Sequence, residues 1–539
     1  MSRRDYLLLF FLGMIVALIA ASLQQVPGYM DADYYYSGAL RLYSSHGFSE
    51  TILWNYLDDP VKIPHPAFTY WMPMPSLLAV LGMRLVRSDS FFAARIFFIL
   101  LTGLVPCLTA FLAFSLSKQR RNALLSGGLA VFPGFYVLYN SLTESVSLYM
   151  VLGSLFLVAL FGQYWHSWRS LPLHYRFFLV GLLAGFLNLT RADGILWLIV
   201  GLGTALWFWL NQRRHWVKNR QRAWGLNGLG ILTSLIVGYL VVMAAWYVRN
   251  VGWYGNIFPP GRSRTLWLTN YDETFSFPAN ILTFQRWFAS GWLHHLKAWR
   301  DAFLMNLKTA IAVEGEVFLV PLILVGFWYF RRERRAQFMG LIWLVTLLIM
   351  TLVFPYAGSR GGFLHSGAAF QPFFWALSAT GLESILKVGA KFRRWDVNLG
   401  MKMLGGGGVL IGLALTLLLI QQRVIGNDLT KPLWANQFRD YTLIEQALQG
   451  EGANKTDIIM TVNPAGYFVA SERPSIVIPN GDEHTLLAAA RQYKAGFLAL
   501  EKDHVKGLDE LYRNPGDRPG LQYLRSVHNI HIFRILVDQ

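Results

Sequence analysis

Two carboxylates and four tyrosines lie close together at residues 28–36, just after the first hydrophobic segment. An acidic side chain at that depth of a membrane is costly unless it lines a wet cavity or takes part in chemistry, so Asp31 and Asp33 are candidate site residues. If a helix starts here, Asp31 is its N-cap and Asp33 points to another side. The alternative is a capped interfacial helix with a belt of aromatic rings. These residues alone leave both interpretations open.

Other polar residues also lie near the ends of hydrophobic segments, and few are predicted in the middle of one. A transporter usually needs ionisable groups near the membrane midplane, so polar residues gathered at one face favour a membrane-surface enzyme. Each residue also has a purely structural interpretation, as an interface anchor, an ion-pair partner, a turn residue or a hydrogen-bonded histidine. The residues are Asp58, Asp59, His65, Arg95, Glu144, Arg191, Asp193, Arg249, Arg262, Arg264, Arg360 and His365.

The composition predicts a multi-span membrane protein. Of the 539 residues, 54% are hydrophobic and only 15% are charged, which is below the share of a typical soluble domain. The net charge of +17 lies mostly in short runs between hydrophobic segments, at 118–121, 213–222, 331–335 and 391–394. Such runs are typical of cytoplasmic loops, so we expect no nucleic-acid partner. Cys107 is the only cysteine, which excludes an intrachain disulfide and a thiolate zinc cluster.

About eleven hydrophobic segments are long enough to be membrane spans. We interpret the first as a retained span rather than a cleaved signal sequence. The segments cover approximately residues 6–23, 91–116, 122–140, 143–164, 175–190, 194–211, 225–248, 316–330, 336–356, 366–387 and 403–421.

The topology depends on residues 70–86, which are also hydrophobic. If this segment lies along the membrane instead of crossing it, every basic run falls on the cytoplasmic side, as the positive-inside rule requires. Pro73 and Pro75 also fit a broken or interfacial helix better than a span. The predicted protein is therefore a multi-pass protein of the cell membrane, with a cytoplasmic N-terminus and long outer loops at 25–90 and 249–315.

The long hydrophobic segments end before Arg423. Residues 1–423 are predicted to form the helical membrane domain, and residues 424–539, which follow it in the chain, a small extracytoplasmic α/β domain. The α/β segment contains no phosphate-binding glycine fingerprint, catalytic triad or metal cluster. We expect strands at 457–462, 475–478, 497–500 and 530–537, helices at 485–493 and 508–512, and turns or caps at 463–466 and 479–482.

Several short motifs occur in an order that is typical of one family. They are Asp31-Ala32-Asp33-Tyr34-Tyr35, His65-Pro66-Ala67-Phe68-Thr69-Tyr70-Trp71, Ala93-Ala94-Arg95, Gly185-Phe186-Leu187-Asn188-Leu189-Thr190-Arg191-Ala192-Asp193-Gly194 and Trp246-Tyr247-Val248-Arg249-Asn250. The pattern resembles the GT-C glycosyltransferases, in particular the protein O-mannosyltransferases, the aminoarabinose transferases of lipid A and their bacterial relatives. The resemblance covers the chain well up to Asn250 and loosely beyond it, and the order of the motifs carries it.

The resemblance implies an enzyme that moves a sugar from a polyprenyl-phosphate donor to an acceptor at the outer leaflet, usually with inversion. It implies that Asp31 is the catalytic aspartate. The family often has Asp-Glu where this chain has Asp31-Ala32, and Lys-Pro-Pro or His-Pro-Pro where this chain has His65-Pro66-Ala67. Three candidates for a second carboxylate therefore stay open: Asp33, Asp58 and Asp59.

The chemistry of such a transfer assigns roles to these residues. A carboxylate can take the proton of an attacking hydroxyl or amine, and we assign this role to Asp31, with Asp33 as the alternative. Arginine matches phosphate oxygens in bidentate geometry, so Arg95, Arg191 and Arg249 are the donor-phosphate candidates. The scheme requires no metal or other cofactor, although carboxylates near a phosphate can bind a divalent cation. Further candidates are Asp58, Asp59, His65, Arg262, Arg264 and His365.

Two other classes of protein stay open as alternatives. A transporter or flippase of lipid-linked sugars would need polar residues along a path through several spans. A non-catalytic membrane scaffold would bind a partner through its outer domain. The sequence does not determine the sugar, the acceptor or the oligomeric state.

Overall fold

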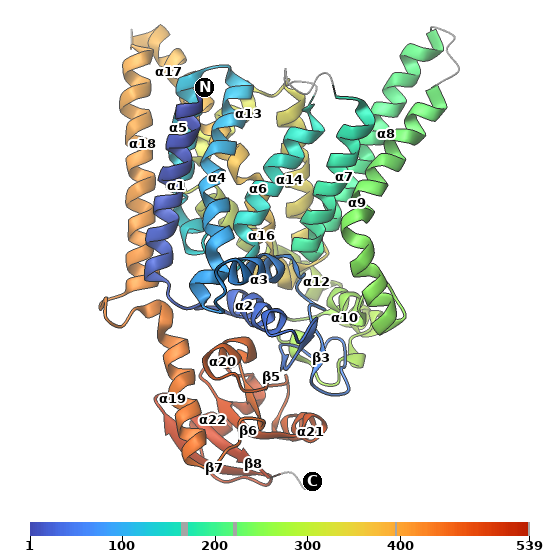
Figure 1. Cartoon of the computed structure of the whole chain (residues 1–539), viewed down its shortest axis with the longest axis vertical. Coiled ribbons are helices and arrows are strands. Elements are labelled where there is room, and N and C mark those ends of the chain that lie inside the picture. Colours follow the sequence, from blue (N-terminus) through green and yellow to red (C-terminus); the bar gives the residue numbers. More distant parts are fainter. Residues whose placement is uncertain (163–170, 219–223, 394–395, 537–539) are drawn as a thin grey trace.

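The computed structural model describes residues 1–162, 171–218, 224–393 and 396–536. Each predicted hydrophobic segment contains a helix, and these helices run side by side as one bundle (Figure 1). Arg220, Arg222 and Arg394, which belong to the predicted basic runs, lie outside the described residues. The bundle helices are α1 (Arg3–Leu23), α4 (Phe91–Ser117), α5 (Arg120–Val131), α6 (Ser145–Leu160), α7 (Leu173–Thr190), α8 (Ile195–Lys218), α9 (Trp224–Tyr254), α13 (Val320–Tyr329), α14 (Arg334–Leu352), α17 (Gln371–Arg393) and α18 (Val397–Leu419).

Seven of the described helices are long and apolar enough to cross a membrane, namely α1, α4, α7, α8, α9, α14 and α18, while α6 and α13 are shorter apolar helices. The prediction of a helical multi-pass protein is thus confirmed. Glycines let α7 and α9 approach closely: a Cβ at Gly181 would lie 1.9 Å from the carbonyl oxygen of Leu235, and one at Gly238 would lie 2.1 Å from that of Phe178. Close backbone contact of this kind stabilises helix pairs in lipid.

Residues 70–86 do not run alongside the bundle. They contain α3 (Met74–Val86), which lies across one end of the bundle beside α2 (Met30–Tyr43), as Figure 1 shows. Pro73 is the N-cap of α3 and Pro75 lies in its first turn, where a helix needs no backbone N–H donor. The segment therefore forms a helix that does not run along the bundle, as predicted.

The predicted N-cap role of Asp31 is wrong. The N-cap of α2 is Tyr29, and Asp31 lies in the first helical turn together with Asp33. A carboxylate in the first turn is favoured by the helix dipole, so the sequence pattern indicated the correct end of the helix but not the capping residue.

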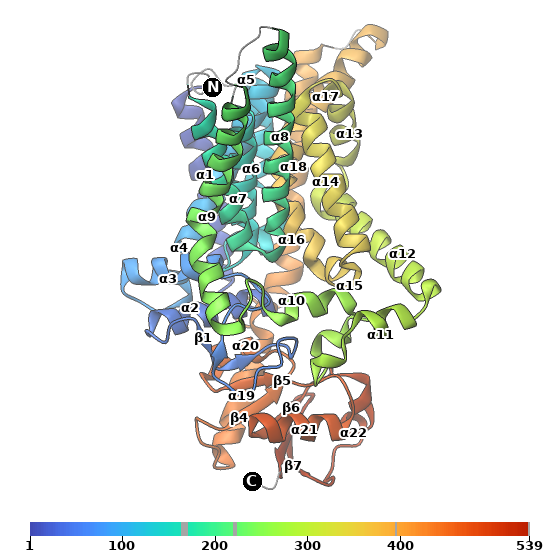
Figure 2. The same ribbon diagram turned by 90° about the vertical axis from the view of Figure 1, so that its right-hand side faces the viewer.

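The loop 249–315 contains α10 (Pro260–Arg264), α11 (Phe284–Ala289) and α12 (Trp292–Thr309), and the last two extend to one side of the bundle (Figure 2). Between α14 and α17 the chain forms α15 (Pro355–Ala357), the wide turn η9 (Gly358–Gly362) and α16 (Phe363–Gly367). The α/β domain lies at the end of the bundle that carries α2, α3 and α10, opposite the N-terminus (Figure 1).

The α/β domain contains a six-stranded sheet in the order β2-β5-β4-β6-β8-β7. The predicted strands and helices of this region are found, whereas β7, α19 and α20 are additional. Strand β2 comes from the first outer loop and pairs in parallel with β5, so the loop completes the sheet. The elements are β2 (Ile52–Leu53), β4 (Ile458–Thr461), β5 (Ser475–Val477), β6 (Ala495–Leu500), β7 (Leu521–Val527), β8 (Ile530–Ile535), α19 (Asn436–Gly450), α20 (Pro464–Ser471), α21 (Glu483–Tyr493) and α22 (Asp509–Arg513).

Candidate active site

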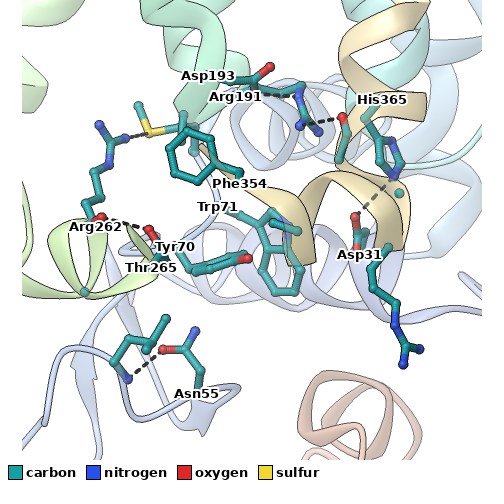
Figure 3. A pocket seen from close by; sticks show the side chains of 18 of the residues that line it. Asp31, Asn55, Tyr70, Trp71, Arg191, Asp193, Arg262, Thr265, Phe354 and His365 are labelled. Carbon is teal, nitrogen blue, oxygen red and sulfur yellow. Dashed lines mark hydrogen bonds and ion pairs between the residues drawn. The ribbon is translucent and has the colours of Figure 1, made fainter. Parts of the chain in front are cut away.

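A cavity of about 310 Å³ lies where the end of the bundle meets the two outer loops (Figure 3). Residues far apart in the sequence line it: α2 and the first loop on one side, the turn after α7, and the segments around α10 and η9 on the other. Aromatic rings alternate with charged groups on its wall. The residues that matter for the argument below are Asp31, Tyr35, Trp54, Asp58, Tyr70, Trp71, Arg191, Asp193, Arg262, Tyr271, Arg360 and His365.

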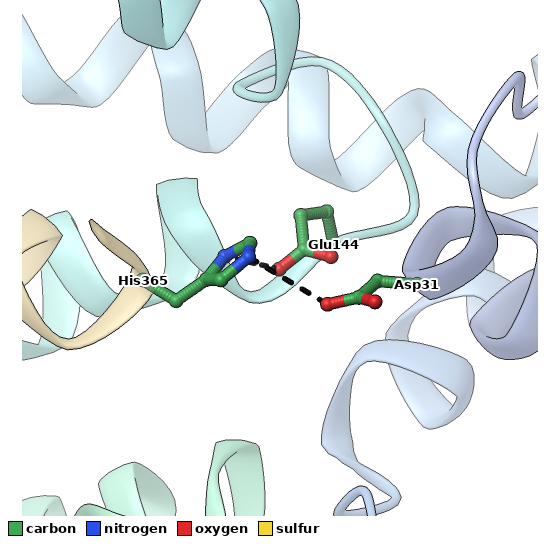
Figure 4. Close-up of side chains that lie close together, drawn as sticks. All are labelled: Asp31, Glu144 and His365. Carbon is green, nitrogen blue, oxygen red and sulfur yellow. Dashed lines mark ion pairs between the residues drawn. The ribbon is translucent and has the colours of Figure 1, made fainter. Parts of the chain in front are cut away.

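Asp31, Glu144 and His365 form a compact cluster beside this cavity (Figure 4). His365 Nδ1 lies 3.1 Å from Glu144 Oε1, and His365 Nε2 lies 3.6 Å from Asp31 Oδ2. Glu144 and His365 are buried, whereas Asp31 keeps part of its side chain exposed. The imidazole therefore bridges two carboxylates, and only Asp31 presents an accessible oxygen toward the cavity.

Local structure fixes the two partners of Asp31. Glu144 is the N-cap of α6, where its Oε1 accepts a 2.7 Å hydrogen bond from Ser145 N, and its Oε2 accepts one of 2.8 Å from the Tyr29 hydroxyl. His365 follows the wide turn η9, in which Gly361 has φ +113°, a conformation that side chains rarely permit. This turn directs α16, and His365 with it, toward α2.

Burial and mutual charge set the proton affinities in the cluster. Burial and the charge of Glu144 raise the pKa of Asp31, although His365 and Arg191 oppose the shift. Burial alone would raise the pKa of Glu144, but His365, Ser145 and Tyr29 hold it below the usual value. Burial would lower the pKa of His365, but Glu144 and Asp31 raise it. The arrangement thus makes Glu144 less basic than an ordinary glutamate, and makes His365 and Asp31 more basic than an ordinary histidine and aspartate.

Three arginines line the cavity. Arg191 follows the last residue of α7, and its Nε donates a 2.9 Å hydrogen bond to Asp193 Oδ1, while Asp193 also accepts one from Ser366 Oγ. Among the described residues, Arg262 and Arg360 pair with no carboxylate, and their guanidinium groups lie over the rings of Phe258 and Tyr271. Cations without an acidic partner in a cavity wall are suited to hold a phosphate.

The structure does not bring every predicted residue into the cavity. Arg95 donates from Nη1 to Gln24 O (2.7 Å) and from Nη2 to Ala21 O (3.0 Å), which caps the end of α1. Arg249 donates to Ala67 O at 2.6 Å and stacks on Trp246. His65 lies 2.8 Å from Ile52 O and 3.5 Å from Glu50. These three residues hold the outer segments together instead of lining the cavity.

The predicted second carboxylates occupy three different places. Asp33 is buried and faces the α/β domain, where it accepts a 2.9 Å hydrogen bond from Asn463. Asp58 lines the cavity, but its Oδ1 accepts the backbone N–H of Gly261 at 2.7 Å. Asp59 pairs with Arg264 at 2.7 Å and accepts the backbone N–H of Ala279. The carboxylate that Asp31 does meet is Glu144.

Sequence reasoning placed Glu144 near the outer face but did not select it as a site residue. Nothing in the spacing between Asp31 and Glu144 indicates that they meet, because two complete bundle helices, α4 and α5, separate them in the chain. The available clue was a glutamate at an outer turn directly before an apolar helix, where a carboxylate caps the helix and stays near the surface.

The same cluster has the composition of a metal site. One imidazole nitrogen and two carboxylate oxygens of His365, Asp31 and Glu144 lie within 4.8 Å of one another. This set of donors suits a divalent transition metal, provided that His365 is neutral when it binds.

Comparisons with known proteins give a consistent result for the fold. ArnT from Cupriavidus metallidurans has a TM-score of 0.53 at 10% identity, and the match covers 96% of this chain and 97% of that one. The oligosaccharyltransferase AglB from Archaeoglobus fulgidus, solved with an inhibitory peptide and a dolichol-phosphate, has a TM-score of 0.53 at 11% identity, covering 92% and 70%. The chain has the GT-C fold. An oligosaccharyltransferase from the same archaeon, solved with Zn and sulfate, matches with a TM-score of 0.51 at 12% identity, covering 90% and 67%.

No family model matches the sequence, and no curated protein matches it significantly. The GT-C fold of this chain is therefore recognised from its three-dimensional arrangement. Within this fold, the cavity with Asp31 lies where the end of the bundle meets the loops 25–90 and 249–315 (Figure 3).

Proposed function

We propose that the protein is an inverting membrane glycosyltransferase, which moves a sugar from a polyprenyl-phosphate donor to an acceptor at the outer face of the membrane. The observation that carries the proposal is Asp31, a carboxylate of raised pKa that faces a cavity also lined by Arg191, Arg262 and Arg360. A base and a group of cations side by side are what transfer from a phosphate ester needs. The GT-C fold supports the proposal, since AglB of this fold was solved with a dolichol-phosphate.

We propose that these groups carry out the sugar transfer in one step. The acceptor hydroxyl or amine attacks the anomeric carbon of the donor sugar and forms the new glycosidic bond, while the bond from that carbon to the phosphate oxygen breaks. The acceptor proton passes to the carboxylate of Asp31. A single displacement of this kind inverts the anomeric configuration. Burial and Glu144 keep the pKa of Asp31 raised, which makes it a stronger base than an ordinary aspartate.

The leaving phosphate takes the electron pair of the broken bond and gains negative charge. Arg262 and Arg360 are not neutralised by carboxylates of the described chain, so they are free to bind this charge. Arg191 is oriented by Asp193 and keeps part of its guanidinium directed at the cavity. The rings of Trp54, Tyr70, Trp71 and Tyr271 offer flat apolar surfaces against which a sugar can pack.

We propose that this transfer needs no metal. His365 lies between Asp31 and Glu144, whose charges raise its pKa, and a proton held on this imidazole would offset their negative charge as a cation would. If a divalent metal binds instead, the same three residues would hold it, and it would supply positive charge to the donor phosphate. Turnover that is insensitive to EDTA supports the metal-free scheme, whereas loss of turnover that Mn²⁺ or Zn²⁺ restores contradicts it.

We also propose that the α/β domain lies outside the cytoplasm and the N-terminus inside. In a Cys107→Ser background, single cysteines at the exposed position 62 and at position 480 should react with an impermeant maleimide from outside, and one at 119 only from inside. Labelling of position 119 from outside would reverse the orientation.

The decisive test is transfer of labelled sugar from a panel of polyprenyl-phosphate sugars by the purified protein, with crude membranes as the source of acceptor. Turnover with any donor supports the proposed enzyme. If a donor binds and moves between leaflets of proteoliposomes without bond cleavage, the protein is a transporter. If no donor binds, the scaffold interpretation replaces the proposal.

A further inference from the structure

Asp33 lies two residues after Asp31 but serves a different part of the molecule. Its side chain is buried, and its Oδ2 accepts a 2.9 Å hydrogen bond from the amide Nδ2 of Asn463 in the α/β domain. The same Nδ2 donates to Gln437 Oε1 at 2.9 Å, while Asn463 Oδ1 caps α20 by accepting the N–H of Gly466 at 3.0 Å. A single asparagine thus links α2 to two helices of the α/β domain.

The contact lies in the place where α/β sheets usually bind a ligand. Strand β4 is flanked by β5 on one side and β6 on the other, and all three are parallel. The chain leaves β4 toward β5 and later returns to β6, which makes the carboxyl ends of β4 and β6 a topological switch point. Asn463 follows β4, and Glu501 follows β6. Asp33 brings its carboxylate to this crevice, at the N-terminus of α20, where an anion is favoured.

The fit at this point is close. A Cβ on Gly466 would lie 2.9 Å from Asp33 Oδ2 and 2.5 Å from Asn463 Nδ2, so only glycine leaves room for the carboxylate. Helices α2 and α20 pack against each other beside it. The crevice is therefore occupied by α2 and does not remain open for a separate ligand.

The α/β domain also holds the start of α2. The indole Nε1 of Trp434 donates to the carbonyl oxygens of Val26 (3.0 Å) and Pro27 (3.1 Å), and its ring packs edge-on against Tyr29. The hydroxyl of Tyr29 in turn donates to Glu144. Residues two positions before and two positions after Asp31 are thus both fixed by the α/β domain.

We propose that the Asp33–Asn463 pair is a positioning contact, through which the α/β domain holds α2 so that Asp31 faces the reacting groups. This inference rests on the proposed function of Asp31 as the base. It makes Asp33 and Asn463 positioning residues and makes the α/β domain a required part of the active site. A small displacement of the first turn of α2 moves Asp31, and misplacement by about 1 Å can cost on the order of 100-fold in rate.

The test exchanges the hydrogen-bond donor, Asn463, and the hydrogen-bond acceptor, Asp33, between the two positions. Asn463→Asp keeps an N-cap oxygen for α20 but sets a second carboxylate against Asp33, and we expect it to lower kcat about 10- to 100-fold with little change in the donor KM. The double variant Asp33→Asn/Asn463→Asp restores one amide donor and one carboxylate acceptor, so kcat should return to within a few-fold of wild type. Asn463→Ser, which keeps a cap but lacks the amide donor, gives a milder variant if Asn463→Asp folds poorly. Asp482→Asn, at the N-cap of α21, is the matched control and should leave kcat unchanged.

Hydrogen–deuterium exchange of residues 30–43 gives a readout that does not depend on turnover. Asn463→Asp should speed exchange in this segment, and the double variant should slow it again. If the wild type transfers no sugar, the proposed function fails, yet the exchange data still decide whether the pair holds α2. A loss of kcat that the double variant does not rescue, or unchanged exchange in Asn463→Asp, would overturn the inference.

Discussion

Replacing Asp31 by asparagine tests the proposed chemistry most directly. The change preserves the shape of the side chain and leaves an oxygen that can face His365 Nε2, now 3.6 Å from Asp31 Oδ2. It removes the negative charge, and the side chain can no longer take the proton of the attacking hydroxyl or amine. Because Asp31 is partly exposed and caps no helix, we expect the variant to fold like the wild type.

The size of the effect follows from the surroundings of Asp31. General base catalysis contributes about 10²- to 10⁴-fold, or about 3–5 kcal/mol at 1.36 kcal/mol per factor of ten. Glu144 cannot replace the lost base, because it is buried and its oxygens are engaged by Tyr29, Ser145 and His365. We therefore expect the loss of kcat to lie in the upper part of this range, about 10³- to 10⁴-fold.

The assay is single-turnover transfer from the polyprenyl-phosphate sugar identified with the wild type. Asp89→Asn is the matched control. Asp89 is exposed between α3 and α4, so this variant carries the same chemical change away from the cavity. The donor should still bind to Asp31→Asn with nearly unchanged affinity. A variant that keeps more than a tenth of wild-type kcat would refute the role of Asp31 as the base.

Three further predictions concern charge in other parts of the protein. Arg191→Gln should lower kcat/KM about 10- to 100-fold, measured against donor concentration, because hydrogen bonds to charged groups contribute about 1.5–3 kcal/mol; an unchanged value would remove Arg191 from the phosphate site. Burial raises the pKa of Glu50 to about 8, so the folded protein holds this proton more tightly than the unfolded chain, and stability falls as pH rises toward that value. Glu50→Gln should therefore flatten the decline of Tm between about pH 5 and 8, and an equal decline in both proteins would contradict this. Arg473→Met removes the buried cation that pairs with Glu445 and leaves the exposed Lys455, at 3.4 Å, beside the hydrogen bonds from Tyr467 and Gln449, and it should destabilise the α/β domain by about 3 kcal/mol in thermal unfolding; a Tm equal to wild type would contradict the structural role of this pair.

The α/β domain shows where prediction from the sequence was incomplete. Strands β4, β5 and β6 were predicted because short apolar runs lie between turn residues, and β8 because Ile530, Ile532, Phe533 and Ile535 recur among polar residues. Strand β7 was not, since it is half-exposed, and a register shift between Tyr523 and Arg525 interrupts its alternation. Asn463-Pro464-Ala465-Gly466 predicts a turn or a cap, and Asn463 is the N-cap of α20, but the helix itself was not predicted because these residues are typical of turns as well as of a capped helix start.

The sequence by itself determined the helical multi-pass class of the protein and one residue of the candidate site, Asp31. Hydrophobic length, the basic runs and the proline pair at the start of α3 are local properties, and they predict a multi-pass helical protein with an interfacial helix and a site carboxylate at residue 31. Only the tertiary structure decided the partners of that carboxylate. Glu144 and His365 reach Asp31 through the packing of distant helices, and Asp33 leaves the site because it lies on another side of α2. Local patterns record which face of a helix is polar, but which distant groups meet that face depends on how all the helices pack together.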